Sequence, residues 1–151
     1  MPAPTAYTYT ALELVTAAKM NDDNDLLQQC LDAIYEPIVL SIQLCTDVAL
    51  SAGNNQWQFH IPAKMNGWTV SGASISRDSG SGTITVQLYN DTDSVDVFSS
   101  GLTISSGNYS TTVTINTSND DVATGDRMQI DVDSAGTSSL GVSVNILFQR
   151  P

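Results

Sequence analysis

The pattern of apolar and polar residues divides the chain into two parts with different periods. From about Gln56 onward, apolar residues alternate with Ser, Thr, Gln and Asp, which is the period of a strand with one buried face. Gly, Ser, Asn and Asp separate these stretches and predict turns between them. About eight short strands are predicted. They start near residue 56 and cover 68–76, 84–89, 95–98, 101–104, 109–115, 128–133 and 142–148, with a turn at 78–82.

No segment between these strands is long and regular enough to be a crossover helix, so parallel βαβ folds are excluded. The best fit is a mainly β domain over residues 51–151. We expect an antiparallel β-sandwich of jelly-roll type, with eight strands in two sheets.

Residues 1–50 have a helical rather than an alternating pattern. Two Pro and alternating Thr and Tyr in residues 1–10 predict an extended arm, and residues 16–21 predict one capped helical turn. A longer helix is predicted from about residue 23 to 35, because its apolar residues share one helical face. Glu36-Pro37 ends this helix, since the residue before Pro avoids the α region. Residues 38–44 are predicted to form a strand or a buried linker.

The apolar face of this N-terminal part is only one helix wide, which is too little for a second core. We therefore expect residues 1–50 to dock onto the sandwich, onto other copies of the chain, or into a larger assembly. The residues expected to carry docking and oligomerisation are Leu12, Leu14, Met20, Leu26, Leu27, Leu31 and Ile34.

The charge of the chain excludes several classes of partner. Five Lys and Arg against sixteen Asp and Glu give a formal charge of −11, too acidic to bind nucleic acid or an anionic membrane surface. No apolar run approaches the roughly 20 residues of a membrane-spanning helix. The first ten residues lack a basic and an apolar region, so no secretory signal is expected.

Few residues in the chain could perform catalysis, so no enzymatic activity is expected. The whole chain holds one His, two Cys, two Glu and two Lys. Cys30 and Cys45 lack zinc-ligand spacing and are expected to be buried thiols rather than a disulfide or a nucleophile. His60 is expected to face solvent, on the strand face opposite Phe59 and Ile61.

Two binding alternatives remain open. The Asp clusters at 91/93/96, 120/121 and 131/133 would suit calcium, but none has the EF-hand ligand order, so loop chemistry and solubilising charge are favoured and no cofactor is expected. The second alternative is a carbohydrate-binding module for host recognition, on a virion or cell surface. Its aromatic platform would use Trp57, Trp68, Tyr89 and Tyr109, although Trp57 shares the parity of Phe59 and Ile61, which predicts a core position.

Residues 11–21, ALELVTAAKMN, resemble a short stretch near the start of tailed-bacteriophage structural proteins. The stretches GTITVQLYN, GLTISSGNYS and GDRMQIDVDSAGTSSLGVSVNILFQ resemble phage accessory virion proteins, in which a Gly/Thr/Ser loop precedes a terminal apolar strand. The resemblance implies a non-enzymatic virion component, commonly trimeric, whose N-terminal part docks to the particle while a jelly roll faces outward.

The chain has no repeats, no heptads and no distal tip domain, which favours a short protein on the head or neck over a long fibre. We therefore predict a capsid-decoration or short head, neck or tail-fibre subunit located in the virion. It would assemble as a homotrimer, and its partners would be other virion proteins such as capsid or connector subunits.

Overall fold

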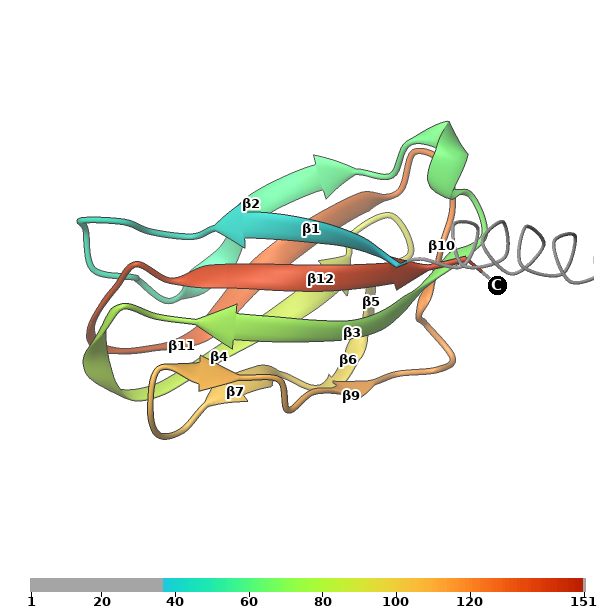
Figure 1. Ribbon diagram of the computed structural model, residues 1–151. Coiled ribbons are helices and arrows are strands. Elements are labelled where there is room, and N and C mark those ends of the chain that lie inside the picture. Colours follow the sequence, from blue (N-terminus) through green and yellow to red (C-terminus); the bar gives the residue numbers. More distant parts are fainter. Residues whose placement is uncertain (1–36, 151) are drawn as a thin grey trace, which may run out of the picture. The chain divides into compact units, whose positions relative to one another are not determined.

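Two five-stranded antiparallel sheets account for most of residues 37–150, the part of the chain that the computed structural model describes (Figure 1). The turn predicted at 16–21 and the helix predicted at 23–35 lie outside the described residues. So do the predicted docking residues Leu12, Leu14, Met20, Leu26, Leu27, Leu31 and Ile34. Across residues 37–150, no helix has the length and apolar character needed to span a bilayer.

The first sheet has the order β1-β12-β3-β10, with β8 also pairing with β3. Its strands are β1 (Ile38–Gln43), β12 (Ser143–Gln149), β3 (Trp68–Ser76), β10 (Asp121–Val122) and β8 (Tyr109–Ser110). The second sheet has the order β2-β11-β4-β5, with β7 also pairing with β4. Its strands are β2 (Gly53–His60), β11 (Arg127–Leu140), β4 (Ser79–Asn90), β5 (Val95–Asp96) and β7 (Leu102–Ile104).

A third, two-stranded sheet joins β6 (Phe98–Ser100) to β9 (Thr114–Ile115), and a 3-10 helix covers Ala63–Met65. Every strand pairing is antiparallel, as predicted. The described residues contain twelve strands rather than about eight. The difference arises because the predicted strands at 95–98 and 109–115 are each broken into two short strands, and because β1 and β10 add to the eight strands predicted from residue 56 onward.

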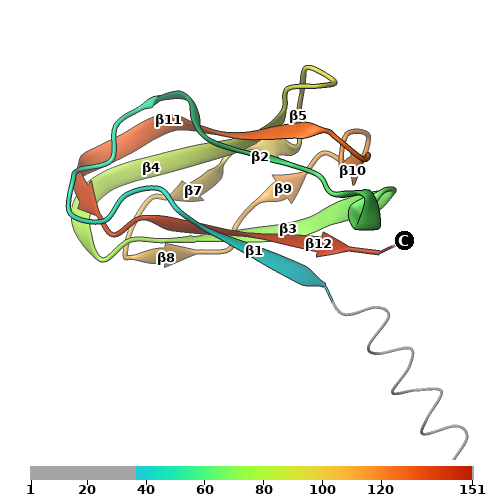
Figure 2. The same cartoon turned by 90° about the horizontal axis from the view of Figure 1, so that it is seen from above.

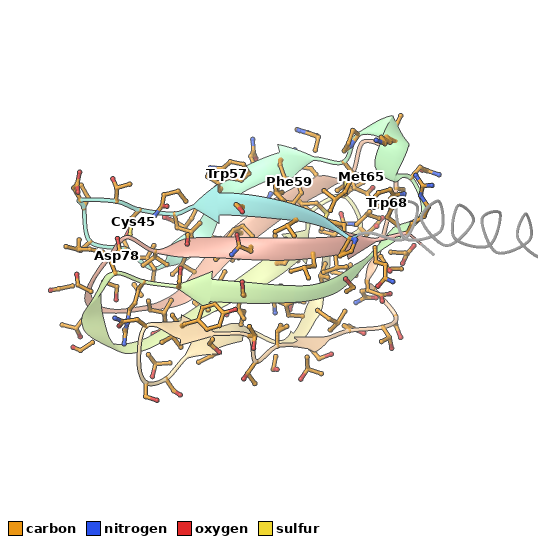
Figure 3. All side chains as sticks on the ribbon, in the orientation of Figure 1. Cys45, Trp57, Phe59, Met65, Trp68 and Asp78 are labelled. Atoms are coloured by element: carbon orange, nitrogen blue, oxygen red, sulfur yellow. The ribbon has the colours of Figure 1, made fainter. Side chains whose placement is uncertain are left out.

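The core lies between the two large sheets and follows the predicted alternation. In β12, the side chains of Val144, Ile146 and Phe148 are fully buried while their neighbours are partly exposed. The inward residues of β4 and β11 are buried in the same way. The ring of Phe59, labelled in Figure 3, meets that of Phe148 edge to face, with centroids 6.3 Å apart. These apolar side chains hold the two sheets together, because their burial is the main favourable contribution to folding.

The segment at 38–43 is a strand of the sandwich, one of the two predicted possibilities. It pairs with β12 along its whole length, from Ile38 opposite Phe148 to Gln43 opposite Ser143. The compact unit accordingly starts at Pro37. The predicted boundary, between residues 50 and 51, lies later in the chain because it assigned the segment 38–44 to the N-terminal part.

The predicted turn at 78–82 and the predicted Gly/Thr/Ser loop after residue 133 are both wrong. These two segments extend β4 and β11 and pair with each other, with Thr137 opposite Ser81 and Leu140 opposite Ser79. The ladder contains register shifts here, and Gly136 adopts φ +66°, a left-handed conformation that other residues rarely adopt. Glycine lets the irregular backbone continue pairing where a turn was expected.

The prediction that Trp57 belongs to the core is also wrong. Its side chain lies on the same face of β2 as that of Phe59, as expected, and the centroids of the two rings are 6.0 Å apart. However, β2 is an edge strand of its sheet, and the Trp57 side chain is 39% exposed. A side chain can face inward on an edge strand and still remain only partly covered.

Candidate functional site

Two surface hollows lie at opposite ends of β3. At one end, here called the entry end, β1 begins at Ile38 beside Phe148 of β12, which pairs with Val70 of β3. At the other end, here called the far end, Arg77 directly follows β3. Val70 and Arg77 are seven residue steps apart, a distance of about 23 Å at the rise of a strand. Figures 1 and 2 show the start of β1 and the end of β12 together at the entry end.

The hollow at the entry end is an apolar groove between the edge strands β1 and β2. Its volume is about 230 Å³, and its lining contains no Lys, Arg or carboxylate. The residues that line it are Ile38, Val39, Leu40, Phe59, His60, Ile61, Pro62, Met65 and Phe148. Val39 is 53% exposed beside it. Within the described residues, β1 pairs only with β12, so its outer backbone edge has no partner strand there. The groove and this strand edge form one uncharged apolar surface.

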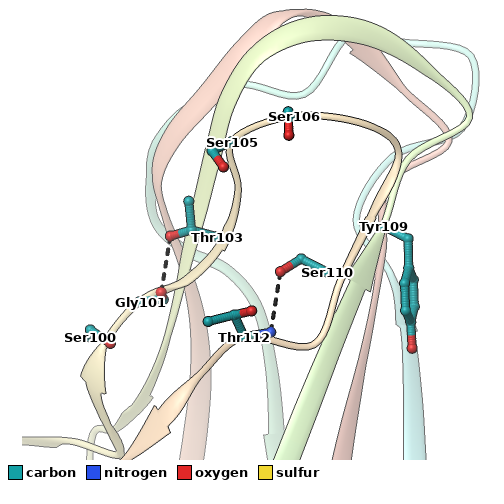
Figure 4. Close-up of a pocket in the computed structure, with 8 residues that line it drawn as sticks. All are labelled: Ser100, Gly101, Thr103, Ser105, Ser106, Tyr109, Ser110 and Thr112. Atoms are coloured by element: carbon teal, nitrogen blue, oxygen red, sulfur yellow. Dashed lines mark hydrogen bonds between the residues drawn. The ribbon is translucent and has the colours of Figure 1, made fainter.

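The hollow at the far end is a polar pocket lined almost entirely by hydroxyl groups, here called the hydroxyl pocket. Its volume is about 460 Å³, and no charged side chain lines it (Figure 4). The residues that line it are Ser100, Gly101, Thr103, Ser105, Ser106, Tyr109, Ser110 and Thr112. Tyr109 is 62% exposed and is the only aromatic residue of the lining.

Two local hydrogen bonds shape the walls of the hydroxyl pocket. The Thr103 hydroxyl donates to the carbonyl oxygen of Gly101 at 3.0 Å, and the backbone N–H of Thr112 donates to the hydroxyl oxygen of Ser110 at 3.2 Å. Figure 4 shows both bonds. Within residues 37–150, no hydrogen bond engages the hydroxyls of Ser105 and Ser106. These two groups are therefore available to a ligand.

A buried arginine holds the loop that carries Ser105 and Ser106. Arg77 is 6% exposed; its Nε and Nη2 donate to the carbonyl oxygen of Gly107, and its Nη1 donates to that of Gly82. Its backbone N–H also donates to the carbonyl oxygen of Asn108. Arg77 thus ties the loop after β7 to the end of β3. The role of Arg77 was not predicted from the sequence. Its position as a lone Arg in a Ser/Gly-rich segment is the feature that could have indicated this role.

The four aromatic residues proposed for a sugar platform do not form one. Trp68 is buried, and the Arg150 guanidinium lies 5.3 Å from its ring centroid. Tyr89 is half-buried in β4. Trp57 and Tyr109 are exposed but lie on strands of different sheets. Of the four, only Tyr109 lines the hydroxyl pocket.

The residues considered for catalysis are not assembled into a site. His60 is exposed, as predicted, and lies at the rim of the apolar groove. Within the described residues, no hydrogen bond joins its side chain to a Ser, Cys or carboxylate. Cys45 is half-buried with a free thiol that donates to the carbonyl oxygen of Ser139 at 3.7 Å, and Cys30 lies outside the described residues.

The acidic clusters serve local structure in the part of the chain that is described. There, no three His, Cys, Asp or Glu residues are placed to hold a metal ion. Asp91 forms an ion pair with Arg127, whereas Asp93 and Asp126 accept hydrogen bonds from the buried Asn90 amide.

Three further aspartates lie close together in the second sheet. Partial burial raises the pKa of Asp133 above its ordinary value of 3.8, and repulsion from Asp131 and Asp96 raises it further.

No protein-family model matches the chain, and no curated protein matches it. Among solved structures, it is similar to a chain in the structure of infectious bursal disease virus, Gx strain, at 12% sequence identity and a TM-score of 0.33. The match covers 76% of this chain and 36% of that chain. The present chain thus corresponds to about a third of the length of that viral chain.

Proposed function

We propose that this chain is a non-enzymatic structural protein of a bacteriophage virion, either a capsid-decoration subunit or a short head, neck or tail-fibre subunit. The observation that carries the proposal is the uncharged apolar surface at the entry end. An edge strand with exposed apolar side chains is a template for association with another chain, and soluble monomers usually block such edges with charges or Pro. The segment IVLSIQ of β1 contains neither.

We further propose that the sandwich is a jelly roll. Strands β1, β12 and β3 are neighbours in one sheet, and β2, β11 and β4 are neighbours in the other. Early and late strands of the chain therefore pair in both sheets, and the strands from β1 to β4 and from β10 to β12 alternate between the two sheets. This nesting is what two Greek keys in a double-sheet jelly roll produce, an architecture found in viral capsid and lectin domains.

The occupant of the apolar surface is another copy of this chain. Val39 and the groove beside it pack against a different face of the neighbouring copy, and three such heterologous contacts close into a homotrimer. Three-fold closure follows the resemblance to phage accessory proteins. The remaining contacts of the trimer are with other virion proteins, such as capsid or connector subunits.

The composition of the other surfaces fits this role. The outward positions of the strands are mainly Ser, Thr, Gln, Asn and Asp, and the formal charge of the whole chain is −11. Like charge keeps many copies on one particle from aggregating and repels the particle's own nucleic acid.

The mass of the full-length protein in solution tests the proposal. Light scattering after size-exclusion chromatography should give a trimer for the natural chain. Val39→Lys should give a folded monomer, because Lys on an edge strand blocks pairing without removing core contacts. Val48→Lys is the matched control: Val48 is 77% exposed but lies outside β1, so this variant should remain trimeric.

A monomeric natural chain, or a Val39→Lys variant that remains trimeric, would contradict the proposed interface. Mass spectrometry of purified particles tests the location. Many copies per virion indicate capsid decoration, a few indicate a neck or tail position, and absence from the particle rejects the virion role.

A further inference from the structure

We propose that the hydroxyl pocket at the far end of the sandwich binds an uncharged saccharide. This inference goes beyond the proposed structural role and does not depend on it. It rests on three features of the pocket: its chemistry, its exposed aromatic ring and the fixed position of its loop.

The lining chemistry matches the hydroxyl groups of a sugar. Each Ser or Thr hydroxyl offers one donor and two acceptor lone pairs, so it can both give and receive hydrogen bonds from a polyol. The hydroxyls of Ser105 and Ser106 have no partner within the described residues, and that of Ser110 accepts one bond from Thr112 but keeps its own donor. A volume of about 460 Å³ lies within the usual range of small-ligand pockets.

The absence of charge in the lining selects against acidic ligands. A phosphate, sulfate or sialic acid would need a cation or several convergent N–H donors. The nearby cation, Arg77, is buried and directs Nε, Nη1 and Nη2 at the carbonyl oxygens of Gly107 and Gly82 instead of at the pocket. An uncharged ligand is therefore favoured over a charged one of the same size.

Tyr109 offers an apolar contact to a saccharide that extends past the edge of the pocket. Tyr109 is 62% exposed, and within residues 37–150 Trp57 is the only other exposed large aromatic residue. Its backbone is fixed by pairing with Ser76 of β3, and Figure 4 shows its ring at the outer edge of the pocket, on the side away from the Ser110 hydroxyl. Tyr offers a rigid, amphipathic surface at a low cost in conformational entropy.

The pocket is ordered before any ligand binds. Arg77 fixes the loop at Gly107 and Asn108, and the Thr103–Gly101 bond fixes the opposite wall. Binding therefore does not require the loop to be ordered, which preserves affinity for a small ligand. The far end is also the end away from Ile38 and Phe148, so the pocket stays open if the entry end is covered.

A glycan array printed with neutral oligosaccharides and with their sialylated and sulfated counterparts tests this inference on the full-length protein. We expect binding to neutral glycans and weaker or no binding to the acidic counterparts. Tyr109→Ala should weaken binding of the best neutral glycan by about tenfold, and Tyr109→Phe should retain most of it, because the ring face makes the contact.

The double variant Ser105→Ala/Ser106→Ala should also weaken binding, through the loss of two hydrogen-bonding hydroxyls. Trp57→Ala and Ser118→Ala are the controls, because they remove an exposed aromatic ring and an exposed hydroxyl away from the pocket; both should bind like the natural protein. Thermal melts establish that each variant is folded. An array without neutral-glycan binding, a preference for acidic glycans, or binding unchanged by Tyr109→Ala in the folded protein would each overturn the proposal.

Discussion

Arg77 and Gly107 are joined by two hydrogen bonds from one guanidinium group to one carbonyl oxygen, at 3.1 Å from Nε and 2.8 Å from Nη2. No carboxylate within the described residues forms an ion pair with Arg77, although its side chain is buried. Backbone carbonyl dipoles therefore compensate its charge. The arrangement connects the end of β3, the loop after β7 and the start of β4, where Gly82 accepts the third bond.

Replacing this guanidinium should destabilise the fold and loosen the wall of the hydroxyl pocket. We expect Arg77→Met to lower the free energy of unfolding by about 3 kcal/mol, because hydrogen bonds to a charged group contribute about 1.5–3 kcal/mol each and the carbonyl oxygens would lose their donors. Arg77→Lys should lower the free energy of unfolding by less, since Lys keeps the charge but cannot reach both carbonyl oxygens. Urea denaturation measures the loss, and faster amide exchange in residues 105–108 should accompany it.

The control for this prediction is Arg127→Met. Arg127 pairs with Asp91 at the surface and is about half exposed, so its replacement should cost less than about 1 kcal/mol. Equal losses for Arg77→Met and Arg127→Met would show that burial of the guanidinium is unimportant.

Gly136 and Gly67 form a matched pair that separates steric clash from backbone strain. Their φ angles are +66° and +75°, so an Ala at either site pays a similar penalty of about 1–2 kcal/mol for the left-handed conformation. A Cβ at residue 136 would also lie 2.7 Å from the carbonyl oxygen of Ser81, whereas nothing lies within 4 Å of a Cβ at residue 67. Thermal denaturation should show Gly136→Ala to be less stable than Gly67→Ala by about 1–3 kcal/mol. Equal effects would mean that β4 and β11 can separate locally at no cost.

The buried amide of Asn90 should not tolerate replacement by its acid. Its Nδ2 donates to carboxylate oxygens of Asp93 and Asp126, and its Oδ1 accepts from the backbone N–H groups of Thr92 and Asp93. Asn90→Asp replaces the donor with an acceptor and adds a third negative charge. We expect a loss of at least about 2 kcal/mol at pH 7, part of which is regained on acidification as carboxyl groups take up protons.

Chemical denaturation of Asn90→Asp at several pH values measures this effect, with Asn90→Ala as the comparison. The Ala variant should be destabilised to an extent that depends much less on pH. An acid variant whose deficit relative to the Ala variant is the same at pH 4 and pH 7 would contradict the electrostatic argument.

The raised pKa of Asp133 gives a pH dependence of known sign. Burial, followed by repulsion from Asp131 and Asp96, makes the folded state hold a proton at Asp133 more tightly than the unfolded state does. The stability that protonated Asp133 contributes is therefore fully present when the pH is below 3.8, the pKa of this group in the unfolded state. It is lost as the pH rises through the pKa of the folded state. Asp133→Asn should remove this loss and be more stable than the natural protein near pH 7, by about 0.5 kcal/mol or less because the residue is largely solvent-exposed.

Melting curves from pH 3 to pH 7 test this prediction. The gain of Asp133→Asn should vanish at the acid end and should shrink at high salt, which screens the repulsion. A stability difference that is independent of both pH and salt would assign the effect to packing instead.

The alternation of apolar residues was sufficient to predict the antiparallel strands, because each buried strand has one apolar face. Val144, Ile146 and Phe148 illustrate this period well. The length of β4 and β11 could not be predicted in the same way. Their glycines, including Gly136, are typical of turns. Only the pairing of β4 with β11 shows that the two strands continue through these glycines.

The candidate site was less accessible to sequence reasoning. The lining of the hydroxyl pocket is drawn from residues whose types are common throughout this Ser- and Thr-rich chain, so Ser105 and Ser106 carried no distinguishing feature. Trp57 and Trp68 were grouped with Tyr109 on residue type alone, but Trp68 is buried and Trp57 lies on a strand of the other sheet. The role of Arg77 depends on carbonyl oxygens 5 and 30 residues away, which no local pattern encodes.

The pairing of Ile38 with Phe148 determines how the sandwich responds to mechanical load. Tension applied between residue 37 and residue 150 would open the β1–β12 ladder one pair at a time, starting at Ile38, since antiparallel hydrogen bonds lie perpendicular to the strands. Such unzipping needs little force. A particle that pulled residues 37 and 150 apart would separate β1 from β12 first. A particle that held both residues at one point would place no tension on the hydrogen bonds between β1 and β12.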